Sequence, residues 1–88
     1  MSRNANRQSR PITKGTDDAI VQYLAALQEF YPAAKGATRV VVRPDSRVIV
    51  SSPLPTRSRD RMRLFDQMAE VGTRLLLETD QYIILSGR

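Results

Sequence analysis

The sequence of 88 residues contains no cysteine, no histidine and no tryptophan. Without cysteine the chain has no disulfides, so packed aliphatic side chains must hold the fold, and a reducing, cytoplasmic setting fits. Because cysteine and histidine are the usual zinc ligands, we also expect no metal and no cofactor. A catalytic base or nucleophile would have to come from carboxylates, tyrosines, lysines or hydroxyls, which makes an enzyme hard to build.

Long apolar runs and glycine-rich loops are missing as well. No stretch approaches the roughly 20 apolar residues that cross a bilayer, and the four scattered glycines form no phosphate-binding loop. The acids have structural explanations, since Asp17 and Asp18 suit a helix start and Asp45 and Asp80 suit turns. A chain of this length forms one domain. We therefore predict a single soluble, non-catalytic domain without a membrane segment.

The formal charge of +5 is concentrated in two segments. Residues 1–14 carry four cations and no acid, and they are predicted to form a disordered basic arm. Residues 39–63 carry seven arginines against two acids, whereas residues 15–38 and 64–88 each sum to −2. Most of the cations are arginine, whose planar guanidinium suits phosphate or carboxylate. A bias of the genome toward arginine codons would produce the same composition.

Residues 15–88 remain as the single folded domain, and the sequence of their first half predicts a helix followed by a hairpin. Thr16 is a suitable N-cap, apolar residues then recur every three positions, and Pro32 ends the helix. Residues 38–42 and 47–51 are rich in β-branched side chains and flank the turn-forming residues 44–46. The sequence therefore predicts two antiparallel strands.

The second half begins like the first, with a helix that opens at Ser58 and is capped by Gly72. Residues 73–87 are ambiguous, because three successive leucines suit a continued helix equally well. TRVVVRPDSRVIVSS, from Thr38, aligns without a gap with TRLLLETDQYIILSG, from Thr73. This similarity favours a second hairpin.

We therefore predict an α+β fold made of a tandem α-β-β repeat, α-β-β-α-β-β, with units at 16–52 and 56–87. Its four-stranded antiparallel sheet would carry two helices on one face. The alternative is one helix from Ser58 to Glu78 followed by a single strand, which gives α-β-β-α-β.

Alternation along the predicted strands sends one set of apolar side chains to the face away from the helices. The candidate interface residues on this face are Val41, Ile49, Leu76, Tyr82 and Ile84. They predict a homodimer or a partner protein packed on the sheet, although strand propensity alone also places aliphatic residues at exposed positions.

Arginines surround these apolar positions and crowd the start of the second helix. Cations there oppose the helix dipole, but free backbone N–H groups beside guanidinium groups suit phosphate. The candidate phosphate-contacting residues are Arg39, Arg43, Arg47, Arg57, Arg59, Arg61, Arg63 and Arg74. The leading hypothesis is a small protein that binds the nucleic-acid backbone through these residues and the basic arm. The alternative is a protein-interaction or assembly module, in which the arginines only surround the interface.

Overall fold

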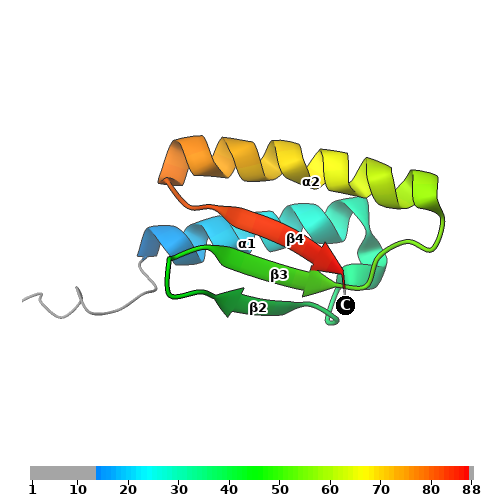
Figure 1. Cartoon of the computed structure of the whole chain (residues 1–88), viewed down its shortest axis with the longest axis horizontal. Helices are drawn as coiled ribbons and strands as arrows, with labels where there is room; N and C mark the ends of the chain where they lie inside the picture. The colour runs from blue at the N-terminus through cyan, green and yellow to red at the C-terminus, as the bar shows by residue number, and fades with distance from the viewer. Residues whose placement is uncertain (1–13, 88) are drawn as a thin grey trace, which may run out of the picture.

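A computed structural model describes residues 14–87, so the predicted basic arm, apart from Lys14, lies outside the described residues. The two helices and three strands are arranged as an α+β fold (Figure 1). In chain order the elements are α1 (Lys14–Phe30), the 3-10 turn η1 (Pro32–Ala34), β2 (Arg39–Val42), β3 (Val48–Ser52), α2 (Ser58–Thr79) and β4 (Ile83–Gly87). The sheet has the order β2-β3-β4, and β2 pairs with β3 antiparallel while β3 pairs with β4 parallel.

The α+β class is confirmed, but the tandem repeat and the four-stranded antiparallel sheet are wrong. Helix α2 runs unbroken through Gly72 to Thr79, so residues 73–78 are helical and form no strand. The alternative order, α-β-β-α-β, is the observed one. Gly72 does not cap the helix. Asp80 does so with φ at 62°, and its N–H donates to the carbonyl of Leu76 at 2.8 Å.

The presence of a helix between β3 and β4 follows from their parallel pairing. Two parallel neighbours need a connection that returns along the whole sheet, and a helix is the usual solution. The 22 residues of α2 extend about 33 Å at 1.5 Å per residue. The gapless alignment compared only local apolar patterns, and such patterns do not distinguish a strand from part of a crossover helix.

The core lies between the helices and one face of the sheet. Its buried apolar residues are Ala19, Tyr23, Leu27, Ala34, Val48, Val50, Leu64, Met68, Leu75, Ile83 and Leu85. The apolar rows expected at strict three-residue spacing are only partly buried, and Val21 and Met62 are 65% and 66% exposed. A helix turns about 100° per residue, so each step of three falls about 60° short of a full turn. Four such residues cannot share one face, and the buried positions are instead spaced by three and four.

Gly72 lies where α2 comes closest to β4. A Cβ added at this position would stand 3.3 Å from the carbonyl oxygen of Ile83 and 3.7 Å from a ring carbon of Tyr23. The first neighbour is backbone of a paired strand, which cannot rotate away. Glycine in mid-helix costs about 1 kcal/mol relative to alanine, and this packing explains why it is present.

We expect Gly72→Val to lower the free energy of unfolding by about 1–3 kcal/mol, because the added methyl groups must push α2 away from β4. Chemical denaturation followed by circular dichroism measures this difference. Thr73→Val, at the exposed neighbouring position, is the control and should change stability by no more than about 0.5 kcal/mol. Equal effects of the two substitutions would contradict a close approach at Gly72.

Candidate binding face and adjoining groove

One face of the sheet is turned away from both helices, and we call it the open face. The register places its side chains in rows that cross all three strands. Arg39, Ser51 and Ser86 form the first row, and Val41, Ile49 and Ile84 form the second. By continuation of the same register, Arg43, Arg47 and Tyr82 form the third, where the N–H of Arg43 donates to Arg47 and that of Val48 donates to Tyr82. An apolar row therefore lies between two rows that carry arginine.

The hairpin turn determines where the residues of the third row lie. Ser46 adopts a left-handed conformation with φ at 73°, and its N–H donates to the carbonyl of Arg43 at 2.9 Å. This agrees with the predicted turn at 44–46. The side-chain amide of Gln81 donates to the carbonyl of Ser46, which ties the turn to the segment before β4. Arg43 and Tyr82 are consequently held at the same end of the sheet.

An ion pair within the turn partly neutralises one arginine of this row. Arg47 Nε donates to Asp45 Oδ2 at 2.8 Å, and the N–H of Arg47 donates to Asp45 Oδ1 at 3.1 Å. The backbone hydrogen bond from Arg47, followed by the contacts with its guanidinium, lowers the pKa of the Asp45 carboxyl. Among residues 17–87, whose side chains the structure describes, this is the one ion pair. Arg39 and Arg43 form no ion pair among these residues, although the charge of Arg43 also helps to lower the pKa of the Asp45 carboxyl.

The eight arginines predicted from the sequence do not form one surface. Arg39, Arg43 and Arg47 lie on the open face, whereas the arginines at the start of α2 lie at the opposite end of the molecule from the hairpin turn (Figure 1). That second group consists of Arg57, Arg59, Arg61 and Arg63. The predicted position of Arg74 on the sheet is wrong, because residue 74 belongs to helix α2 and lies outside the sheet.

Arg61 has a structural role at the start of α2. Its Nη1 donates to the carbonyls of Pro55 and Thr56, each at 3.2 Å, and its Nη2 donates to the hydroxyl of Ser58. The N-cap position, Arg57, makes no side-chain capping bond. The guanidinium of Arg61 thus closes the connector after β3, which leaves the other three arginines of the group as the candidates for an anion.

Four of the five predicted interface residues do lie together. Val41, Ile49, Tyr82 and Ile84 share the open face. Tyr82 is 48% exposed and Val41 is 44% exposed. Leu76 is the exception, because it belongs to α2 and not to a strand. It is nevertheless 36% exposed and adjoins Tyr82 across a groove.

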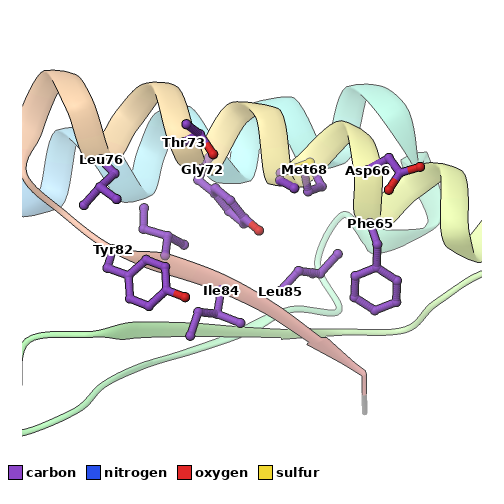
Figure 2. A pocket seen from close by; sticks show the side chains of 12 residues that line it. Phe65, Asp66, Met68, Gly72, Thr73, Leu76, Tyr82, Ile84 and Leu85 are labelled. Carbon is purple, nitrogen blue, oxygen red and sulfur yellow. The ribbon is translucent and has the colours of Figure 1, made fainter.

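This groove runs between α2 and β4, and we call it the α2–β4 groove. It has a volume of about 440 Å³. Figure 2 shows Leu76 and Phe65 toward its two ends, with Tyr82 and Ile84 on the β4 side. Tyr82 and Ile84 therefore border both the groove and the open face. The sequence did not predict this groove, because it exists only when α2 continues past Gly72.

Tyr23 of α1 also lines the groove, although only 1% of its surface is exposed. Its hydroxyl makes no hydrogen bond with any residue in the described part of the chain. Burial raises the pKa of this hydroxyl far above its usual value. A buried polar group without a partner is uncommon in folded proteins and calls for an explanation. In the sequence, Tyr23 was interpreted only as part of an apolar helix face. Its hydroxyl, a polar group on that face, was the feature that could have indicated a site there.

Comparisons with protein-family models, curated proteins and solved structures gave no match to this chain. Across residues 14–87, no helix is long and apolar enough to span a membrane, and no group of three histidine, cysteine or acidic side chains is placed to hold a metal ion. The open face and the α2–β4 groove are the features from which a function can be inferred.

We expect Tyr23→Phe to raise the free energy of unfolding at pH 7 by about 1 kcal/mol, because it removes a buried hydroxyl that lacks a partner among the described residues. The unfolded chain loses the tyrosine proton near pH 10 while the folded chain retains it, so this group removes stability as the pH rises above about 10. The gain in Tyr23→Phe should therefore grow between pH 9 and pH 11.

Urea unfolding across that pH range measures both effects, with Tyr82→Phe, at an exposed ring, as the control. A Tyr23→Phe protein that is less stable than the unsubstituted protein at pH 7 would show that the hydroxyl has a favourable partner in solution.

Proposed function

We propose that this protein is a non-catalytic nucleic-acid-binding protein that holds a single strand across the open face of its sheet. The observation that carries the proposal is the arrangement of three rows, in which an apolar strip lies between arginines and adjoins an exposed tyrosine ring. Sheets that bind single strands combine the same two elements, namely aromatic or apolar platforms for bases and cations for phosphates.

The charges of the open face suit phosphates at both of its ends. Arg39 and Arg43 form no ion pair with an acid in the described part of the chain. They are four residues apart on one strand, which separates their Cα atoms by about 13 Å. Val41, Ile49 and Ile84 lie between them. A strand that crosses these rows can contact cations at its phosphates while its bases cover the apolar row and Tyr82.

The arginines at the start of α2 form a second basic group near one end of the sheet. Arg39 begins β2, at the end of the sheet away from the hairpin turn, and α2 starts at this same end of the molecule (Figure 1). Arg57, Arg59 and Arg63 have no ion pair among the described residues. Cations in a first helical turn are unfavourable for the helix itself, so their presence supports a role in binding an anion.

We expect Arg39→Gln and Arg43→Gln each to weaken the binding of a single-stranded oligonucleotide and to reduce the slope of log affinity against log salt by about 0.7, the value for one lost phosphate contact on a single strand. The measurement is fluorescence anisotropy of labelled single strands and duplexes, carried out at several salt concentrations. Arg74→Gln removes the same charge from α2 and is the matched control.

Tyr82→Ala should also weaken single-strand binding, by about 1–3 kcal/mol, without changing the salt slope. An equal loss in the Arg74 variant would show that net charge alone drives binding. The absence of binding to every oligonucleotide at low salt would overturn the proposal.

The second candidate function is an assembly module that buries the open face against a second copy of the chain. The observation that favours it is the continuity of exposed apolar groups from Val41 through Ile84 and Tyr82 to Leu76 and Phe65 of α2. Contiguous apolar surface of this kind marks many interaction sites. In that case the arginines surround the interface, as arginine often does.

Light scattering after size-exclusion chromatography distinguishes the two functions. The assembly function predicts a dimer that persists at high salt and that dissociates in Ile49→Asp, because a charge in the middle row would be buried unpaired. Val21→Asp, at an exposed position of α1, is the control. A monomer at high protein concentration would eliminate this second candidate.

A further inference from the structure

The α2–β4 groove joins the open face without a boundary. Tyr82 and Ile84 line the groove and also end the third and second rows of the open face. A nucleic-acid strand on that face would therefore pass the mouth of the groove. The volume of about 440 Å³ falls within the range of sites that hold small molecules, which begins at about 300 Å³.

The lining combines apolar walls with hydroxyl groups. Phe65 and Leu76 lie toward the two ends of the groove and Met68 and Leu85 line it between them (Figure 2). The hydroxyls belong to Thr73 and Tyr82, which are exposed, and to Tyr23, which is buried and lacks a partner among the described residues. The carboxylate of Asp66 also lines the groove (Figure 2). A ligand that fits this lining has flat apolar surfaces and hydrogen-bonding groups along its edge.

A peptide added to the sheet as a fourth strand does not fit the same space. β4 is the edge strand of the sheet, but α2 already occupies the position beside it at Ile83. The carbonyl oxygen of Ile83 would be only 3.3 Å from a Cβ at Gly72. Neighbouring strands require about 4.8 Å between backbones, so no strand can pass between the two elements at this point.

We propose that the α2–β4 groove receives one base of the single strand bound on the open face, and that the Tyr23 hydroxyl hydrogen-bonds to the edge of that base. This inference rests on the proposed nucleic-acid function. Tyr82, at the mouth, stacks on the neighbouring base, while Arg43 contacts an adjoining phosphate. The buried hydroxyl then gains the partner that the described part of the chain does not supply.

Two substitutions separate the groove from the phosphate contacts. Tyr23→Phe removes only the hydroxyl and should weaken binding of a single-stranded oligonucleotide by about 2- to 10-fold. Ala69→Trp places a large ring at an exposed groove position and should weaken binding by about 5- to 100-fold, which corresponds to one lost base stack. Neither change should alter the salt slope, because no phosphate contact is lost.

Matched controls use the same substitutions away from the groove. The control for the hydroxyl is Tyr31→Phe, at the residue that follows the end of α1. The control for the large ring is Ala25→Trp, at an exposed position of α1. Neither substitution should weaken binding. An abasic oligonucleotide of the same length keeps every phosphate. It should bind all variants alike, more weakly than the natural oligonucleotide binds the unsubstituted protein.

A parallel titration with free nucleosides tests the groove independently of phosphate binding. Amide resonances of Thr73, Leu85 and Gly72 should shift in NMR spectra of the unsubstituted protein, with smaller shifts in Tyr23→Phe. If nucleosides shift these resonances but no oligonucleotide binds, the groove is a base site and the proposed function is wrong. If oligonucleotides bind equally to the unsubstituted protein, Ala69→Trp and Tyr23→Phe, the groove inference is overturned and the proposed function stands. If neither ligand binds, both are overturned.

Discussion

The close approach of α2 to β4 at Gly72 is the constraint on which the rest of the structure depends. Because position 72 has no side chain, the helix backbone can lie against the carbonyl of Ile83 while Tyr23 packs beneath both. This contact packs α2, the crossover between β3 and β4, against the strand that pairs parallel with β3. The core residues of both helices pack against one side of the sheet, and its other side stays uncovered. The open face and the groove beside β4 are direct consequences.

The hairpin could be predicted because its signals are local. Two runs of β-branched residues around Pro44, Asp45 and Ser46 require little beyond their own sequence to form antiparallel strands. The end of α1 before Pro32 is local in the same way, since proline cannot continue a helix. The mixture of Val41, Ile49, Ile84 and Tyr82 with Arg39 and Arg43 on one face also follows from strand alternation, and it persisted although the predicted fourth strand did not form.

The end of α2 could not be predicted, because the deciding contacts are distant in the sequence. Leucines at 75–77 suit a helix or a buried strand, and Gly72 alone reads as a helix end. Gly72 is required in the middle of the helix because it packs against Ile83 and Tyr23, which are 11 and 49 positions away from it in the sequence. The positions of Arg74 and Leu76 were wrong for this reason. The groove was not anticipated, since its two walls are adjacent only in the correct topology.

Several features of this chain are unfavourable for stability when considered separately. An apolar row is left on an uncovered sheet, and the buried hydroxyl of Tyr23 has no partner among the described residues. Most arginines beside that row and at the start of α2 form no ion pair with an acid in the same part of the chain. Sequences usually avoid each of these, and departures from stable design gather at functional sites. Exposed apolar residues elsewhere, such as Val21 and Met62, belong to no comparable cluster of rows and need no explanation. The distinguishing property is that the apolar row, the Tyr82 ring and the groove above Tyr23 share one continuous surface. Selection for folding alone gives no reason for them to coincide, whereas binding of a flat, polar-edged ligand attached to phosphates accounts for all three.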